Sequence, residues 1–212
     1  MDACVFDLDG VLVDSEPVWE EVRRAFVAEH GGHWQSDTQA RLMGMSTGEW
    51  AEYLHELGVS LSPERIADGV IQQMKARYHR GVPLMPGAVA AVARLAGRVP
   101  LGLASSSPRA LIDAVLAETG LGAHFTATVS TEEVAKGKPA PDGYLEAARK
   151  LGVAPERCVA VEDSSNGLRS AHAAGMRVVA IPHPAYPPAS DALDLAWRTL
   201  PSLAALTPDI LS

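Results

Sequence analysis

Cysteine is scarce in this sequence, and its two cysteines, Cys4 and Cys158, form no Cys-x-x-Cys pair. The chain therefore has no candidate for a redox or metal motif of that kind. Both residues fall in short apolar segments that we expect to be buried strands, so we predict reduced core thiols in a cytoplasmic protein. The seven histidines, including His30 and His33, show no usual zinc spacing and are interpreted as surface or core residues.

Long hydrophobic runs and an excess of positive charge are also missing. No apolar segment is long enough to span a bilayer, and because the first apolar segment begins almost at Met1 we expect no signal peptide. The net charge of −8 argues against nucleic acid or an anionic membrane as a partner. We expect a monomer with a small-molecule ligand, and an anionic ligand would have to be attracted by local groups.

Internal repeats and low-complexity segments are absent from the sequence as well. The chain has 212 residues, of which 47% are hydrophobic and 21% are charged. These values describe an ordinary globular protein with one core, or with a core and a smaller insert.

The chain is organised around the segment Ala3–Leu12, which reads ACVFDLDGVL. Four apolar residues predict a short strand buried on both faces, and the carboxylates of Asp7 and Asp9 follow it. Because strand alternation points residues i and i+2 the same way, both acids can emerge at the carboxyl end of one strand. Ligands of open α/β sheets bind at that edge. Two like charges this close need a proton or a cation, and a divalent metal is the obvious choice.

Two simpler interpretations of this Asp-x-Asp-Gly motif have to be weighed. A calcium loop that starts at Asp7 would need Gly at its sixth position and Glu at its twelfth, where this chain has Leu12 and Val18. A plain Asp-Gly turn without chemistry is common. The rest of the chain decides between a turn and a site.

The hydrophobic period changes once along the chain. Helical patterns with no strand between them continue to about Leu84, and helices are expected at residues 17–30, 36–43, 47–57 and 63–80. Beyond Met85, helices expected at 87–96, 108–119, 141–151 and 164–174 alternate with strands expected at 99–104, 126–129, 158–161 and 177–181. This alternation is typical of βαβ units with a parallel sheet.

The fold class is therefore α/β, with a discontinuous sheet domain. We predict an α/β core domain at residues 1–14 and 85–212 and an inserted helical domain at residues 15–84, joined by linkers near Ser15 and Leu84. An insertion directly after the Asp7/Asp9 strand lies above the carboxyl edge of the sheet, where it can act as a lid. The Pro- and Ala-rich tail, residues 183–212, predicts only a short helix after Pro201.

Polar residues that suit a phosphate follow the later strands: Ser105, Ser106 and Ser107, then Lys138, then Glu162 and Asp163. Each group has a simpler explanation: N-capping for the serines, a solvated loop for the lysine and a cap for the acidic pair. Hydroxyls at a helix N-terminus also favour an anion. Pro139 and Pro141 stiffen the segment around the lysine. A lysine that was merely solvated would not need such a stiffened segment.

In combination these groups predict a phosphate site beside a magnesium site. Mg²⁺ takes hard oxygen ligands, with phosphate and water supplying the rest, and the candidates are Asp7, the backbone carbonyl of Asp9, Glu162 and Asp163. Ser105 and Lys138 can donate to the phosphate. A carboxylate about 4 Å from a phosphate dianion is repelled by roughly 8 kcal/mol at an effective dielectric of about 20. Mg²⁺ and Lys138 must offset this repulsion before an aspartate can attack phosphorus.

These elements, in this order, resemble the haloacid dehalogenase superfamily, and the helical insert points to its β-phosphoglucomutase-like branch. The residues that carry the match are Asp7–Glu16, Ala104–Ser107, Gly137–Asp142 and Val161–Ser164. The resemblance covers essentially the whole chain. It implies a Rossmann-like, three-layer parallel-sheet core under an inserted, mobile, all-helical cap, with Mg²⁺ as cofactor.

The resemblance also implies residue roles. By the family pattern, Asp7 is the nucleophile that forms an aspartyl-phosphate, and Asp9 protonates the leaving oxygen and then activates water. The phosphoryl group is bound by Ser105, Ser106 and Lys138, and the metal is held by Asp7, Asp9, Glu162 and Asp163. An acid at position 9 disfavours the dehalogenase members, which do not need it.

The implied activity is that of a Mg²⁺-dependent phosphatase acting on a small phosphorylated metabolite, with a sugar phosphate as the expected class. A phosphosugar mutase is the alternative enzyme, although the mutase pattern has a cap histidine and a cap arginine where this chain has Trp19 and Thr47. A non-catalytic phospho-ligand binding module is a further alternative, against which the intact Asp7 and Asp9 argue. The cap candidates for specificity are Glu16, Arg23, Met45, Ser46, Thr47 and Lys75.

Overall fold

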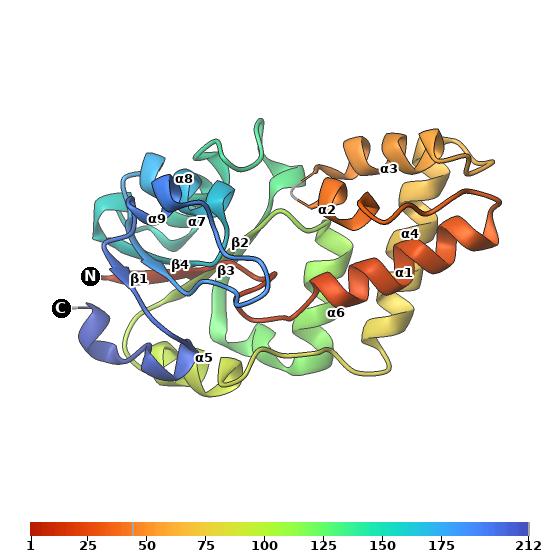
Figure 1. The fold of residues 1–212 in the computed structure, drawn as a ribbon. Helices are drawn as coiled ribbons and strands as arrows, with labels where there is room; N and C mark the ends of the chain where they lie inside the picture. The colour runs from red at the N-terminus through yellow and green to blue at the C-terminus, as the bar shows by residue number, and fades with distance from the viewer. Residues whose placement is uncertain (44, 212) are drawn as a thin grey trace.

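The computed structural model describes residues 1–43 and 45–211, so Gly44 of the predicted cap and Ser212 of the predicted core lie outside the described residues. A parallel sheet with the order β3-β2-β1-β4-β5-β6 forms the centre of the molecule (Figure 1). Its strands are β1 (Ala3–Phe6), β2 (Leu101–Ser105), β3 (Phe125–Ser130), β4 (Cys158–Glu162), β5 (Arg177–Ala180) and β6 (Arg198–Thr199). The predicted α/β class is confirmed.

The strand β1 lies in the middle of the sheet and pairs in parallel with β2 on one side and β4 on the other. The chain moves outward from β1 to β3, and then returns to build β4, β5 and β6 on the opposite side. The strand order therefore reverses next to β1. In open α/β sheets, ligands bind beyond the carboxyl ends of the strands at this kind of reversal.

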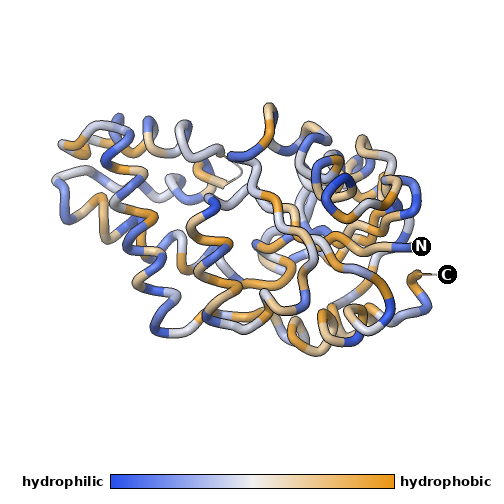
Figure 2. The backbone as a smooth tube through the Cα atoms, turned by 180° about the vertical axis from the view of Figure 1, so that it is seen from behind, coloured by the Kyte–Doolittle hydropathy of each residue, from blue (hydrophilic) through white to orange (hydrophobic). Residues whose placement is uncertain are grey.

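The apolar residues of the strands face two separate hydrophobic clusters. In β1, Cys4 and Phe6 pack into one cluster, whereas Ala3 and Val5 pack into the other. The first face is covered by α5 (Ala88–Ala96) and α6 (Arg109–Thr119), and the second by α7 (Asp142–Leu151), α8 (Ser165–Ala173) and α9 (Ser190–Leu193). Figure 2 shows hydrophobic colour along the strands between these helices. The three-layer architecture is confirmed, and Cys4 and Cys158 are buried, free thiols.

Four helices lie between β1 and α5 and form a group beside the sheet, which we call the helical insert (Figure 1): α1 (Glu16–Glu29), α2 (Thr38–Leu42), α3 (Thr47–Glu56) and α4 (Pro63–Tyr78). Capping sets two of the starts, because the Ser46 and Ser62 hydroxyls accept hydrogen bonds from backbone amides at the third helical position. No helix among the described residues is long and apolar enough to cross a membrane.

The two connections to the helical insert lie side by side. The Asp14 amide donates to the Pro83 carbonyl over 2.8 Å, and the Met85 amide donates to the Leu12 carbonyl over 2.9 Å. The chain therefore enters and leaves the helical insert at adjacent points, as the two expected linkers require. The assignment of the helical insert as a separate domain stays a prediction.

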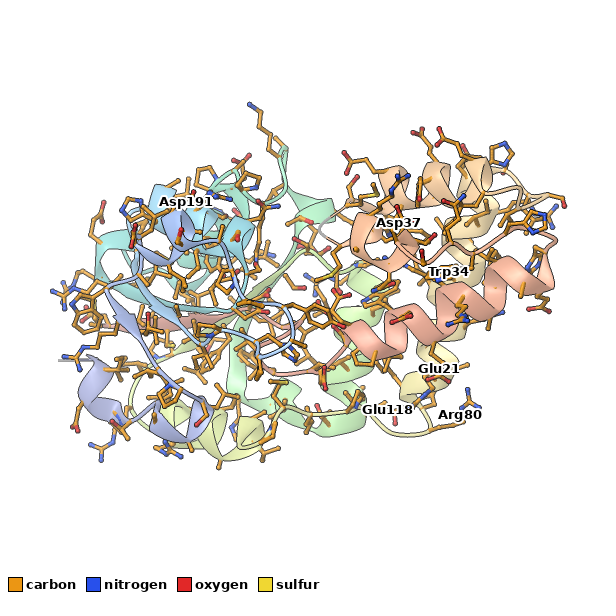
Figure 3. The ribbon with its side chains drawn as sticks, viewed as in Figure 1. Glu21, Trp34, Asp37, Arg80, Glu118 and Asp191 are labelled. Atoms are coloured by element: carbon orange, nitrogen blue, oxygen red, sulfur yellow. The ribbon has the colours of Figure 1, made fainter. Side chains whose placement is uncertain are left out.

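The helical insert also packs against the core through α4 and α6. Apolar side chains of both helices, such as Met74 and Ile112, belong to one hydrophobic cluster. At the surface, His79 Nδ1 lies 2.6 Å from Glu118 Oε1, and Figure 3 labels Glu118 at this junction. Because exposed ion pairs contribute little to stability, the apolar contact is what holds this side of the helical insert.

The C-terminal tail differs from the prediction. After β5 the chain forms α9, the edge strand β6 and two 3₁₀ helices, Leu203–Ala205 and Pro208–Leu211. The helix expected after Pro201 is thus a 3₁₀ helix rather than an α-helix. The missed strand β6 consists of two exposed residues that pair with β5, and hydrophobic periodicity cannot reveal so short a segment.

Candidate active site

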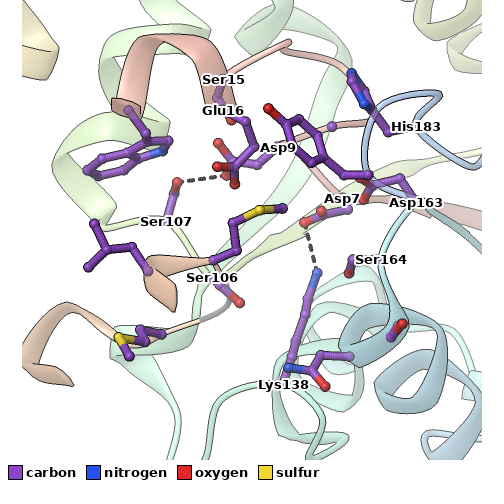
Figure 4. A pocket seen from close by; sticks show the side chains of 18 of the residues that line it. Asp7, Asp9, Ser15, Glu16, Ser106, Ser107, Lys138, Asp163, Ser164 and His183 are labelled. Carbon is purple, nitrogen blue, oxygen red and sulfur yellow. Dashed lines mark hydrogen bonds and ion pairs between the residues drawn. The ribbon is translucent and has the colours of Figure 1, made fainter. Parts of the chain in front are cut away.

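A pocket of about 450 Å³ lies between the carboxyl end of the sheet and the helical insert (Figure 4). Its core side is lined by Asp7, Asp9, Ser106, Ser107, Lys138 and Asp163. Its other side is lined by residues of the linker and the helical insert, among them Ser15, Glu16, Trp19, Arg23, Met45 and Thr47. Residues from several strand ends that are far apart in the sequence therefore meet at one place.

Asp7 is held by the lysine of the loop before α7. Lys138 Nζ lies 2.8 Å from Asp7 Oδ1 and 2.6 Å from Glu162 Oε1. The side chains of Lys138, Asp7 and Glu162 are only 6%, 8% and 0% exposed. The Asp7 amide donates to the Val161 carbonyl over 3.0 Å, which extends the β1–β4 pairing and sets the point at which the carboxylate emerges.

Burial and repulsion shift the titration of this cluster. Burial raises the pKa of Asp7, and the Glu162 and Asp9 carboxylates add to the rise while Lys138 opposes it. Burial also raises the pKa of Asp163, together with the charges of Glu162 and Asp7. Burial alone would lower the pKa of Lys138, but the Asp7 and Glu162 carboxylates raise it, so the lysine stays charged.

The acidic residues fit a divalent metal. Asp7, Glu162 and Asp163 each offer a carboxylate oxygen, and these oxygens lie within 4.8 Å of one another. Asp163 Oδ1 is buried and has no hydrogen-bond partner among the described residues. With all three carboxylates ionised, as metal binding requires, they and the single ammonium of Lys138 carry a net charge of −2, which a divalent cation would neutralise. Hard oxygen donors of this kind suit Mg²⁺.

Glu162 is fixed more tightly than the other two acids. Its Oε1 accepts hydrogen bonds from Lys138 and from the Tyr144 hydroxyl, the latter over 2.7 Å, and its Oε2 accepts one from the Asp163 amide over 3.1 Å. A Cβ at position 167, in the first turn of α8, would lie only 1.9 Å from this carboxylate. Glycine is therefore the residue that fits at this position. Glu162 therefore positions Lys138 as well as contributing to the metal cluster.

Gly10 lets the chain turn directly after the second acid. Its φ of +76° lies in the left-handed region, and a Cβ there would lie 2.0 Å from Asp163 Oδ2. The turn is closed by a hydrogen bond of 2.7 Å from the Gly10 amide to the Val13 carbonyl. The interpretation of Asp-Gly as a turn is thus correct for the backbone, and the same turn brings Asp7 and Asp9 to the pocket.

Asp9 contacts the serines that follow β2. Its Oδ2 accepts hydrogen bonds from the Ser107 hydroxyl over 2.7 Å and from the Ser105 hydroxyl over 3.1 Å. Ser105 is 1% exposed, and its hydroxyl also accepts a hydrogen bond from the Ser107 amide. Among the described residues, Ser106 and Ser107 line the pocket but Ser105 does not. Ser107, which the sequence analysis did not select as a site residue, therefore joins Ser106 at the pocket wall.

The structure divides the specificity candidates of the helical insert. Glu16, Met45 and Thr47 line the pocket. The Ser46 hydroxyl instead donates to Glu49 Oε2 over 2.7 Å and caps α3, and Ser46 is not among the described lining residues. Of the two further candidates, Arg23 lines the pocket, whereas Lys75 is not among the described residues that do so.

Two aromatic residues of the tail complete the pocket and were missed by the sequence analysis. The rings of His183 and Tyr186 stack with centroids 5.2 Å apart, and His183 Nε2 lies 3.5 Å from Asp14 Oδ1. They belong to the loop after β5, at the same sheet edge as the other site residues. Ligands of open α/β sheets bind beyond the carboxyl ends of the strands, so the predicted strand 177–181 would have indicated His183, which follows it.

Comparisons with known proteins agree with this geometry. A family profile described as haloacid dehalogenase-like hydrolase matches residues 1–175. Hexitol phosphatase B of Escherichia coli K12 is 35% identical over 188 residues, which cover 86% of this chain and 84% of that protein. Fructose-1-phosphate phosphatase YqaB of the same strain is 32% identical over 176 residues, which cover 82% of this chain and 93% of that protein.

A solved structure of the predicted branch has the same fold. The β-phosphoglucomutase of Clostridium difficile superposes with a TM-score of 0.80 at 23% identity, over 100% of this chain and 95% of that chain. The Rossmann-like core and the position of the helical insert agree with this likeness. On the evidence of the matching profile and of relatives that are aligned over most of their length, the chain belongs to the haloacid dehalogenase-like hydrolases.

Proposed function

We propose that this protein is a Mg²⁺-dependent phosphatase that hydrolyses a small phosphorylated metabolite, a sugar phosphate, through an aspartyl-phosphate on Asp7. The observation that carries the proposal is the buried Asp7–Lys138 pair beside Asp9 in an open pocket. A site that only bound phosphate would not place two acids there, because they repel a dianion. The sugar-phosphate class is supported by relatives that are hexitol and fructose-1-phosphate phosphatases. The monomeric state and the cytoplasmic location stay predictions.

In the proposed reaction, an Asp7 carboxylate oxygen forms a bond to phosphorus while the bond to the ester oxygen breaks. The leaving oxygen takes a proton from the Asp9 carboxyl group. Asp9 then accepts a proton from the water that attacks phosphorus, which releases inorganic phosphate and restores Asp7. The serine hydroxyls hold Asp9 Oδ2, so we assign the proton transfer to its other oxygen.

Asp7, Glu162, Asp163 and the Asp9 carbonyl are the proposed metal ligands. A Mg²⁺ ion held there would offset the negative charge of the phosphoryl oxygens. Lys138 adds a second positive charge beside Asp7, and Ser106 and Ser107 border the space for the phosphoryl group on the opposite side. The Lys138 ammonium, which is held by Asp7 and Glu162, favours the transition state because it needs no reorganisation during the reaction.

The helical insert is the proposed lid of this pocket. It is attached by two adjacent connections, a geometry that permits hinge motion, and its residues form one wall of the pocket. Closure excludes bulk water from the phosphoryl group. We propose that Glu16, Met45 and Thr47 contribute to the choice of substrate, because they line the pocket on the lid side.

A panel of phosphate esters tests the proposed function. We expect inorganic phosphate to be released in the presence of Mg²⁺, with hexitol and ketose phosphates preferred over nucleoside monophosphates. With a hexose 1-phosphate and a trace of the bisphosphate, free sugar and inorganic phosphate should form. Accumulation of hexose 6-phosphate faster than inorganic phosphate would favour the mutase, and no release from any ester would contradict the assignment.

Magnesium is expected to raise the melting temperature more at pH 8 than at pH 5. The pKa values of Asp7 and Asp163 are raised from 3.8 by burial, so the folded protein without metal holds protons that the unfolded chain releases. The stability due to these protons is complete below about pH 4 and is lost as pH rises through the raised pKa values. Because the metal needs the deprotonated carboxylates, it stabilises most where the protons are already gone.

The size of this effect follows from mass action. A metal concentration about 100 times Kd adds roughly 2.7 kcal/mol, or about 5–10 °C for a chain of this length. Thermal unfolding with MgCl₂ and with EDTA at both pH values measures it. Equal shifts at pH 5 and pH 8 would show that the metal does not bind at these carboxylates.

A further inference from the structure

Buried polar atoms without a partner are concentrated around this pocket. Within the described residues, four buried side-chain atoms have no hydrogen-bond partner: Ser15 Oγ, Arg23 Nε, Gln39 Oε1 and Asp163 Oδ1. Asp163 belongs to the metal cluster. The other three lie on the side of the helical insert, where Ser15 and Arg23 line the pocket and Gln39 is bonded to the lining residue Glu16. We call Ser15, Glu16, Arg23 and Gln39 the polar wall.

Arg23 is the cation of the polar wall. It is 5% exposed, and its guanidinium lies 4.3 Å from the ring centroid of Trp19 and 5.0 Å from that of Trp50. These aromatic contacts stabilise the charge but leave the in-plane Nε–H without an acceptor. A buried donor without an acceptor is costly, so it is a site at which a ligand oxygen would be favoured.

Glu16 supplies an acceptor in the same wall of the pocket, and Gln39 orients it. Gln39 Nε2 donates to Glu16 Oε2 over 2.9 Å, which orients the carboxylate and leaves Gln39 Oε1 without a donor. Figure 4 shows Ser15 and Glu16 across the pocket from Lys138, at the end where the leaving group of a phosphate ester would lie. The polar wall thus offers both donors and acceptors, and a hydroxyl group satisfies both.

The charges in this part of the pocket disfavour a second anion. Arg23 is the only lysine or arginine among the described lining residues besides Lys138, which is bonded to Asp7 and Glu162. Asp14 and Glu16 line the same region and would repel a carboxylate or a second phosphate. Hydroxyl groups can donate to these carboxylates and accept from Arg23 without adding charge.

We propose that the polar wall recognises the hydroxyl groups of a neutral, polyhydroxylated leaving group, with Arg23 and Glu16 as the residues that determine specificity. The inference rests on the proposed phosphatase function and narrows its substrates to monophosphates of polyols and sugars. Acidic leaving groups and bisphosphates are then poor substrates. Gln39 is a positioning residue that acts through Glu16.

The test compares substrates with and without hydroxyl groups. Arg23→Met keeps an unbranched apolar stem against Trp19 and Trp50, although a shorter one, and removes the donor. We expect kcat/KM for glucitol 6-phosphate to fall about 10- to 100-fold, the loss expected for a hydrogen bond to a charged group. Acetyl phosphate, which has no hydroxyl groups, should change less than about threefold. Arg24→Met, an exposed neighbour on the same helix, is the matched control and should leave both substrates unchanged.

A substrate–variant cycle separates recognition from a structural role. Glucose 6-phosphate and its monodeoxy analogues are compared with wild type, Arg23→Met and Glu16→Gln. With wild type, kcat/KM for at least one deoxy analogue should be about tenfold lower than for glucose 6-phosphate. With the variant that lacks the side chain bound to the missing hydroxyl, the difference between the two substrates should be much smaller. If Arg23→Met does not fold, the cycle is repeated with Gln39→Leu, a substitution at a partly buried position.

Three results would overturn the inference. One is an equal loss for glucitol 6-phosphate and acetyl phosphate in Arg23→Met, and another is no coupling between any hydroxyl and either residue. The third is a wild-type enzyme that prefers fructose 1,6-bisphosphate or 2-phosphoglycolate to fructose 1-phosphate. Failure of the proposed function is distinguishable, because wild type would then release phosphate neither from any ester nor from acetyl phosphate, an acyl phosphate.

Discussion

Asp7→Asn should abolish phosphate release from every ester, with a loss of at least about 10⁴-fold in kcat. An amide nitrogen or oxygen cannot form the acyl phosphate that the proposed reaction requires. Release of inorganic phosphate at saturating substrate and Mg²⁺ measures the loss. The aspartyl-phosphate, trapped as a mass increase on wild type after a rapid acid quench, should be absent from the variant.

The fold should survive this substitution. Burial and the neighbouring carboxylates raise the pKa of Asp7, so removing its charge relieves repulsion in the cluster. We therefore expect a melting temperature in EDTA that is no lower than that of wild type by more than a few degrees. Asp14→Asn, a carboxylate in the same pocket but outside the metal cluster, is the matched control and should keep its activity within about tenfold. Near wild-type turnover by Asp7→Asn would refute the mechanism.

Lys138→Ala should depress all substrates together, by about 2–4 kcal/mol in transition-state stabilisation, or roughly 30- to 1000-fold in kcat/KM. The ammonium lies beside the attacking carboxylate rather than beside the variable part of the substrate. The ratio of kcat/KM between glucitol 6-phosphate and acetyl phosphate should therefore stay within about threefold. A change in substrate preference without a general loss of kcat/KM would mean that Lys138 contacts the leaving group rather than the phosphoryl group.

The same substitution should destabilise the protein. It leaves the buried carboxylates of Asp7, Glu162 and Asp163 without their cation, a change that typically costs about 3–5 kcal/mol. Without the lysine the pKa values of Asp7 and Asp163 rise further, so the stability of the variant falls increasingly below wild type as pH rises from 4 to 8. Thermal unfolding across this range measures the difference. Lys136→Ala, an exposed lysine two residues away, is the control and should match wild type.

Much of the fold could be predicted because its signals are local. Four apolar residues before two acids predict a buried strand, and the alternating contacts of Ala3–Phe6 with two clusters confirm it. The change of hydrophobic period near residue 85 separates the helical insert from the βαβ units. Since the carboxyl ends of parallel strands share one edge, the same reasoning brings Asp7, Lys138 and Glu162 together before any coordinate is known.

Other features had no local signal, or had one that was overlooked. The strand β6 is two residues long, and the loop with His183 carries no hydrophobic pattern. Ser46 was assigned to the pocket, although Ser46-x-x-Glu49 is a capping-box pattern that the structure confirms. Which of the serines at the end of β2 lines the pocket depends on the turn into α6, and among the described residues it is Ser106 and Ser107 rather than Ser105, the last residue of the strand.

The sequence by itself determined the order of the elements, the layers of the core and the residue types at the sheet edge, because side-chain period and chain direction are properties of neighbouring residues. Only the tertiary structure decided the charge balance and the unpaired atoms of the pocket. The Lys138–Asp7 bond joins residues 131 positions apart, and the raised pKa of Asp7 arises from burial among groups brought from other strands. Among the described residues, Arg23 Nε likewise has no partner in surroundings that α1 and α3 build through Trp19 and Trp50, and desolvation of this kind depends on the packed surroundings of a group.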